Sequence, residues 1–157
     1  MRVEEPRHII CAVRGGPESR ETVTRAIDLA LESGAWLTFF RVLDAEFLNH
    51  ATIGPLSVVY RELREMGQFA MLILCDRAQR RGVQKVDSIV REGNVRKQLR
   101  EFANETHADV MVMGRPTRSP GSNTFKADEF DAFVAELRED ASLEIVVVEP
   151  LLASEAK

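Results

Sequence analysis

Short apolar runs alternate along the chain with longer segments in which apolar residues recur every three or four positions. The short runs are rich in β-branched residues, which predicts buried strands. They cover residues 8–13, 36–43, 86–90, 109–113 and 143–148. Strands that alternate with helices form βαβ units, so the pattern predicts an α/β fold with a parallel sheet and helices on both faces.

The segments between the runs predict helices with one apolar face each. The first begins near Pro17 and stops at Gly34, and a later one begins after Asn94, a predicted N-cap. Their apolar faces contain Val23, Ala26, Ile27, Ala30 and Leu31 in the first helix, Val95, Leu99, Phe102 and Ala103 in the later one, and Phe130, Phe133, Val134 and Leu137 in the last helix.

The helical pattern of residues 56–81 is longer and more apolar than the others. Its main stripe is formed by Val59, Leu63, Met66, Ala70 and Ile73, and four more residues widen it: Met71, Leu72, Leu74 and Cys75. This surface is more than one face of a sheet covers. Either the helix is deeply packed, or part of its apolar surface meets a partner chain.

Composition predicts one globular domain, residues 1–150, followed by a short tail, 151–157. The chain has 157 residues, of which 45% are hydrophobic and 29% charged. A formal net charge of −4 argues against nucleic acid or an anionic membrane as a partner. No apolar run approaches the roughly 20 residues of a membrane span, and the amino end does not resemble a signal peptide, so a cytoplasmic protein is expected.

Catalytic and metal-binding patterns are not found in the sequence. Cys11 and Cys75 are predicted to be two thiols rather than a disulfide or a metal pair. His8, His50 and His107 are isolated, and each is predicted to be a surface or edge histidine rather than a ligand. We therefore predict no catalytic residue and no metal.

Two loops are candidates for binding an anion. In parallel sheets ligands bind beyond the carboxyl ends of the strands, and the loops at 14–17 and 114–124 follow two of the predicted strands. Arg14, Arg115 and Arg118 suit an anion if they gather there, and Gly121 and Ser122 offer backbone and hydroxyl donors. The alternative is an ordinary solvated loop with scattered arginines.

Three stretches resemble the universal stress protein family over nearly the whole chain. RHIICAVRGGPESRETVTRAIDLA is similar to the family's first strand and helix, REGNVRKQLREFANETHADVMVMG to its third strand, third helix and fourth strand, and EIVVVEP to its last strand. The resemblance implies the strand order 3-2-1-4-5. It also implies a homodimer that pairs through the last strand, at Ile145, Val146, Val147 and Val148.

One branch of this family binds ATP through a glycine signature after the fourth strand. Glycines let backbone N–H groups approach phosphates, and the last glycine opens a helix whose positive end faces the anion. Here Gly114 matches, but Thr117 replaces the second glycine. The last glycine falls on Ala127 when counted forwards, or on Asp131 when counted back from the last strand. Arg14 also replaces the aspartate that usually follows the first strand.

The resemblance therefore implies a non-catalytic stress-response or interaction module that does not bind ATP in the family's usual way. An alternative is a protein that binds a nucleotide or small anion with the two loops. The candidate ligand-binding residues are Val13, Arg14, Gly15, Val42, Gly114, Arg115, Thr117, Arg118, Gly121 and Ser122. A second alternative is an ATP pyrophosphatase-type enzyme, because RGGPES at 14–19 is similar to the SGGxDS motif of that class.

Overall fold

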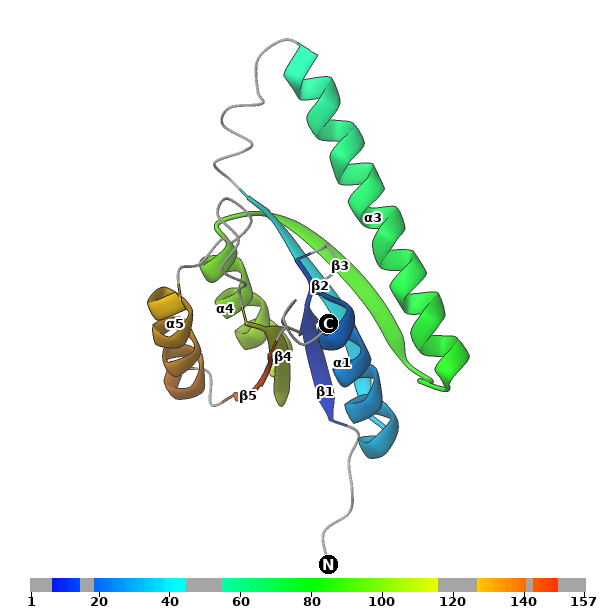
Figure 1. Ribbon diagram of the computed structural model, residues 1–157, viewed down its shortest axis with the longest axis vertical. Helices are drawn as coiled ribbons and strands as arrows, with labels where there is room; N and C mark the ends of the chain where they lie inside the picture. Colours follow the sequence, from blue (N-terminus) through cyan, green and yellow to red (C-terminus); the bar gives the residue numbers. More distant parts are fainter. Residues whose placement is uncertain (1–6, 15–18, 45–54, 116–126, 141–142, 150–157) are drawn as a thin grey trace, which may run out of the picture.

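The chain folds as a parallel five-stranded sheet in the order β3-β2-β1-β4-β5, with helices on both faces (Figure 1). The computed structural model describes residues 7–14, 19–44, 55–115, 127–140 and 143–149. The predicted fold class and strand order are confirmed. None of the described helices combines the length and apolarity that a membrane span requires.

The elements follow one another as the hydrophobic pattern predicts. The strands are β1 (His8–Ala12), β2 (Trp36–Asp44), β3 (Val86–Gly93), β4 (Val110–Gly114) and β5 (Glu144–Val148). The helices are α1 (Ser19–Ser33), α3 (Pro55–Arg81), α4 (Val95–Thr106) and α5 (Ala127–Asp140). The third strand extends three residues beyond its predicted end, because it stays paired with β2 as far as Gly93.

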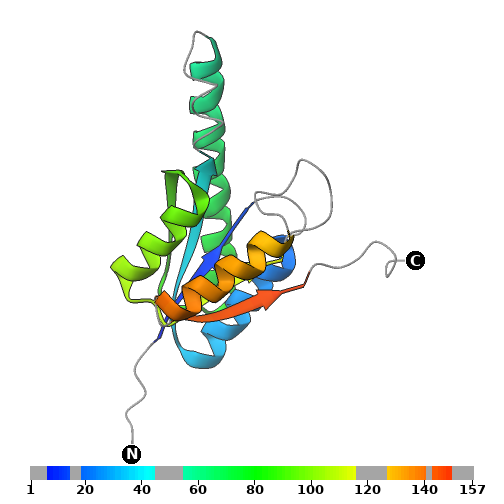
Figure 2. The same ribbon diagram turned by 90° about the vertical axis from the view of Figure 1, so that its left-hand side faces the viewer.

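Each face of the sheet carries its own apolar core, since neighbouring residues of a strand point to opposite faces. Ile9 and Cys11 of β1 pack with α1 and α3, whereas Ile10 packs with α4 and α5. Figures 1 and 2 show the two pairs of helices on opposite sides of the sheet. The central strands are thereby covered on both faces.

Local signals in the sequence end and begin helices as predicted. Gly34 follows α1 with φ of +71°, a conformation that glycine adopts without strain. The side chain of Asn94 accepts a hydrogen bond of 2.9 Å from the backbone N–H of Lys97, so it is the N-cap of α4. Both cysteines are free; Cys11 is buried and Cys75 is half-buried.

The predicted packing face of α3 is wrong. Met66 and Ile73, both in the expected stripe, are 65% and 55% exposed, whereas Gly67, Met71 and Ala78 are buried against the sheet. The side of the helix that faces the sheet is therefore the one with Gly67, Met71 and Ala78, not the predicted stripe. The side chains of residues 59 and 63 lie outside the described part of the chain.

Leu31 of α1 is also more exposed than the predicted apolar face implies. It belongs to the predicted stripe of α1, yet 37% of its surface is exposed, whereas Val23, Ala26, Ile27 and Ala30 are buried. Leu31 lies at the rim of the α1 face, next to the turn at Gly82, where the sheet no longer covers it.

Candidate functional site

The loops after β1 and β4 meet at the carboxyl edge of the sheet, as predicted. The guanidinium of Arg14 donates to the carbonyl oxygen of Arg115 across 3.5 Å. The backbone N–H of Arg115 in turn donates to the carbonyl of Val148 across 2.9 Å, which adds the tip of β5. Two of the predicted arginines are therefore close together; Arg118 lies outside the described residues.

Arg115 is held by two carboxylates. Its Nη1 lies 2.9 Å from Oδ1 of Asp131, near the start of α5, and its Nε lies 3.1 and 3.0 Å from the two carboxylate oxygens of Glu149. The guanidinium also lies over the ring of Phe130, 5.5 Å from its centroid. This side chain thus joins β4 to α5 and to the residue that follows β5.

Among the described residues at this edge, the charges of Arg14 and Arg115 are balanced by those of Asp131 and Glu149. The hydrogen bonds that the guanidinium donates to Asp131 and to Glu149 raise the pKa of Arg115, so the guanidinium stays charged. Both carboxylates are exposed at the same edge. An approaching polyanion meets these two negative groups as well as the arginine, and like charges repel.

Gly114 is required by packing against α1. A Cβ atom at this position would lie 2.6 Å from the hydroxyl oxygen of Thr22, a buried residue of α1, and 3.7 Å from the Arg14 guanidinium. Real Cβ atoms do not approach other atoms at 2.6 Å. A side chain at 114 would therefore require Thr22 or the helix to move, whether or not a ligand is present.

The helix that would receive a phosphate begins with acidic residues. Helix α5 starts at Ala127, the position where the forward count puts the last glycine of the ATP signature. The sequence places Asp128, Glu129 and Asp131 in its first five positions. Carboxylates at this end stabilise the helix dipole and take the place that an anion would occupy.

The other predicted ligand-binding residues are less informative. The side chain of Val13 is buried in the core under α1, and half-buried Val42 packs on the opposite face with α4 and α5. These two side chains therefore do not face each other. Gly15, Thr117, Arg118, Gly121 and Ser122 lie outside the described residues, as does most of the RGGPES motif.

A second polar cluster lies at the opposite, amino-terminal edge of the sheet. His8 is buried rather than at the surface, so that prediction is wrong. Its ring stacks on Trp36 with centroids 4.2 Å apart, and its Nε2 lies 2.8 Å from the Thr38 hydroxyl, which donates to Asp87 across 2.6 Å. Burial lowers the pKa of His8, although Asp87 and Asp109 act in the other direction.

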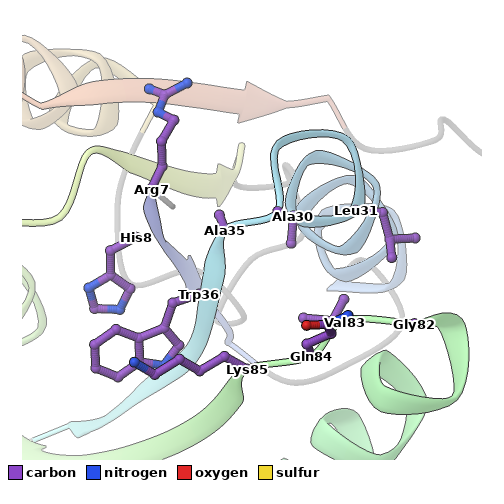
Figure 3. Close-up of a pocket in the computed structure, with 11 residues that line it drawn as sticks. Arg7, His8, Ala30, Leu31, Ala35, Trp36, Gly82, Val83, Gln84 and Lys85 are labelled. Carbon is purple, nitrogen blue, oxygen red and sulfur yellow. The ribbon is translucent and has the colours of Figure 1, made fainter. Parts of the chain in front are cut away.

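A pocket of about 620 Å³ opens beside this cluster (Figure 3). It is lined by residues from the end of α1, the start of β2 and the turn at Gly82, and Arg7 and Lys85 supply two permanent positive charges. Arg7 is paired with Glu144 at 3.1 Å, and the ammonium of Lys85 lies 4.3 Å from the centre of the Trp36 ring. Both cations are engaged within the protein, as Arg115 is at the carboxyl edge.

The family model of the universal stress proteins matches residues 5–125, more than half of the chain. The chain belongs to the universal stress protein family. A comparison with curated protein sequences found no match. Membership in this family agrees with the observed strand order 3-2-1-4-5.

Solved structures of universal stress proteins have the same fold at low sequence identity. The hypothetical protein MJ0577 has a TM-score of 0.72 and 12% identity, covering 94% of this chain and 98% of its own. A universal stress protein in complex with cAMP has a TM-score of 0.58 and 21% identity, with 92% and 97% covered. One from Arabidopsis thaliana with AMP bound has a TM-score of 0.56 and 15% identity, with 97% of each chain covered.

The carboxylates of the universal stress protein site were missed at the sequence level. In the sequence Asp131 stands out only because it occupies a glycine position of the ATP-binding signature, and that signature does not include Glu149. Glu149 directly follows the last strand and Arg115 directly follows its neighbour β4, so a parallel sheet brings the two side chains to one edge. The parallel pairing of β4 with β5 is the feature from which the Arg115–Glu149 pair could have been predicted. Nothing in the sequence indicates the close approach of Thr22 to Gly114.

Metal chemistry finds no support in the described part of this universal stress protein. Within residues 7–14, 19–44, 55–115, 127–140 and 143–149, no three His, Cys, Asp or Glu side chains are grouped so that they hold a metal ion.

Proposed function

We propose that this universal stress protein is a non-catalytic, dimeric interaction module of the stress response that does not bind ATP in the family's usual way. The observation that carries the proposal is the double ion pair of Arg115 with Asp131 and Glu149. The arginine best placed to neutralise a phosphate at the tip of β4 is instead part of the protein's own network.

A triphosphate tail would meet unfavourable charge in this site. It carries several negative charges, and Arg115 contacts it only by leaving two carboxylates behind. Those carboxylates would then be unpaired beside the tail. Since α5 also begins with acidic residues, the helix end that usually attracts phosphate is already compensated.

The proposed dimer uses β5, the edge strand of the sheet. Among the described residues β5 pairs only with β4, and its central residues Ile145, Val146, Val147 and Val148 are apolar. An open apolar edge strand favours pairing with another strand, and a two-fold axis lets the same strand of a second copy provide it. Concentration-dependent protection of the β5 amides from hydrogen exchange would support this pairing, and a monomer at every accessible concentration would exclude it.

Binding of a nucleoside monophosphate at the same edge is the second candidate. The family includes structures with cAMP and with AMP, and these ligands carry fewer negative charges than ATP. Arg14 and the backbone around Gly114 face that edge. A single phosphate needs fewer donors than a triphosphate, so the carboxylates at 131 and 149 oppose it less.

Calorimetric titration separates the two candidates. Purified protein is titrated with ATP, ADP, AMP and cAMP, and nucleotide released by heat is analysed by chromatography. We expect no saturable binding of ATP. Tight ATP binding that is lost in Arg115→Ala would overturn the first proposal, whereas binding of AMP or cAMP that is lost in Arg14→Ala would favour the second.

A further inference from the structure

The outward side of α3 carries a continuous apolar surface. Met66, Phe69, Leu72 and Ile73 are 65%, 65%, 60% and 55% exposed, and we call these four residues the outer stripe. Residues three and four apart lie side by side on a helix, so the four side chains adjoin one another. The side of α3 that packs on the sheet contains Gly67, Met71 and Ala78 instead.

Much of α3 also extends beyond the sheet. Figures 1 and 2 show its amino-terminal turns projecting past the ends of the strands. Val58, in this projecting part, is 54% exposed. Single exposed apolar residues are common on monomers, but a row of large ones on a projecting helix indicates a surface that another protein covers.

Charged residues flank the outer stripe asymmetrically. Glu62 and Glu65 lie on its amino-terminal side, whereas Arg77 and Arg80 lie on its carboxyl-terminal side, and all four are exposed. Arg77 donates to the hydroxyl of Thr24 on α1, whereas Arg80 pairs with Asp76 on α3 itself. Both arginines remain exposed. Arg61 and Arg64 also lie in the amino-terminal half and Asp76 in the carboxyl-terminal half, and Arg64 pairs with Glu92 of β3. Charge complementarity therefore depends on which individual residues face each other across the outer stripe.

This pattern is complementary to itself only in the antiparallel orientation. When two copies of α3 cross antiparallel near Phe69, Glu62 of one copy faces Arg77 of the other and Met66 faces Ile73. Arg61 then faces Asp76, another pair of opposite sign. In a parallel arrangement every charge faces its own copy, so like charges repel.

We propose that the outer stripe is a self-association surface, on which α3 of a second copy of this chain packs antiparallel about a two-fold axis near Phe69. The spacing Glu62-Met66-Phe69-Ile73 alternates four, three and four residues, as in helices that pack along a seam. One pair of helices buries less than the roughly 1,600 Å² of a standard interface, so the contact is weak and depends on concentration. It is independent of the β5 pairing.

Charge reversal tests the proposal by sedimentation across a concentration series. Glu62→Lys/Glu65→Lys and Arg77→Glu/Arg80→Glu each place a like charge opposite residue 77 or 62 of the partner copy, and the second substitution of each pair adds the same charge nearby. Each double variant should therefore weaken the association at least about tenfold. An equimolar mixture of the two variants should regain it. The matched control is Glu101→Lys/Glu139→Lys, which changes exposed charge on α4 and α5 and should associate as the wild type does.

The readout distinguishes this surface from the β5 dimer. If β5 also pairs, loss of the α3 contact converts a tetramer to a dimer; if β5 does not, it converts a dimer to a monomer. Phe69→Ser/Ile73→Ser should have the same effect on mass while the thermal stability stays close to that of the wild type. A wild-type mass that is unchanged by concentration, or by these substitutions, overturns the proposal.

Cysteine cross-linking tests the orientation. The background is Cys75→Ser, because the remaining Cys11 is buried and its burial raises the thiol pKa. Glu62→Cys and Arg77→Cys lie about 22 Å apart along the helix at 1.5 Å per residue. We expect disulfide-linked pairs when the two variants are mixed and few when either is oxidised alone; efficient self-linking of each variant indicates parallel packing and overturns the proposal.

Discussion

The guanidinium of Arg115 donates to the carboxylate of Asp131 across 2.9 Å, and this pair joins the tip of β4 to the beginning of α5. Glu149 completes the arrangement from the end of β5. A position expected to attract phosphate is therefore occupied by an internal network.

Removal of the two carboxylates should increase the affinity for phosphate groups. In Asp131→Asn/Glu149→Gln the charge of Arg115 is no longer compensated. At roughly 0.2–1 kcal/mol for each exposed pair, binding of AMP should strengthen about two- to thirtyfold in calorimetry. Glu136→Gln/Glu139→Gln on α5 makes the same change in net charge farther from Arg115 and should bind as the wild type does; equal gains in both variants would show a non-specific charge effect.

Gly114→Ala should destabilise the protein through contact with Thr22. The new Cβ atom would lie 2.6 Å from the Thr22 hydroxyl oxygen, and overpacking of this kind costs about 1–3 kcal/mol in the free energy of unfolding. Urea denaturation of Gly114→Ala, Thr22→Ala and the double variant measures the coupling. The double variant should be more stable than the sum of the single effects predicts. Strict additivity would mean that the glycine is required for another reason.

Met71→Ala and Met66→Ala test the orientation of α3. The two residues have the same chemistry, but Met71 is 1% exposed and Met66 is 65% exposed. Removal of the buried side chain should cost about 2–5 kcal/mol in the free energy of unfolding. Met66→Ala should change the free energy of unfolding by no more than about 0.5 kcal/mol when it is measured at a concentration too low for self-association. The reverse order would show that the helix is rotated.

Loss of the Asn94 cap should weaken α4. The Asn94 side chain accepts the Lys97 N–H at the start of the helix, and replacement of such a cap by alanine costs about 1 kcal/mol. Asn104→Ala is the matched control, because Asn104 is exposed within the same helix and alanine is favoured there. Thermal denaturation should show a decrease for Asn94→Ala and none for the control.

His8 should make the protein less stable as the pH falls. Burial lowers the pKa of folded His8 below the ordinary histidine value of 6.5, so the unfolded chain binds the proton more readily than the folded one. The stability that the neutral His8 ring contributes is fully present above pH 6.5 and is lost as the pH falls below that value. The melting temperature of the wild type should therefore decrease between neutral and mildly acidic pH.

His8→Asn should melt at a lower temperature throughout that range but with a flatter dependence on pH. His107→Asn is the control, since His107 is exposed in a left-handed conformation that asparagine tolerates. Parallel pH profiles for the wild type and His8→Asn would mean that other groups cause the dependence.

The order of elements was predictable because each strand is an unbroken apolar run and most helices carry a single apolar stripe. Helix α3 was not, because its apolar residues extend around more than half of its circumference. Periodicity alone does not say which part of such a helix faces the sheet. The structure shows that the side with Gly67, Met71 and Ala78 faces the sheet.

The partners of Arg115 could not be predicted from the sequence for a different reason. Asp131 and Glu149 are 16 and 34 residues away along the chain, and only the strand order brings them to the same edge. Comparison with the ATP-binding signature shows an aspartate at 131 where glycine is expected, but it does not show that this aspartate pairs with Arg115. Electrostatic networks between loops depend on topology, which local sequence patterns do not contain.

The glycine at 114 has a consequence for how such sequences are classified. Its hydrogen atom faces a hydroxyl on the neighbouring helix, so spacing between helix and strand is enough to explain the absence of a side chain. A sequence search that treats this glycine as a sign of nucleotide binding would instead be detecting a steric requirement of the fold. Ligand assignments in proteins of this kind are better made from the charges opposite the strand tip than from the glycine itself.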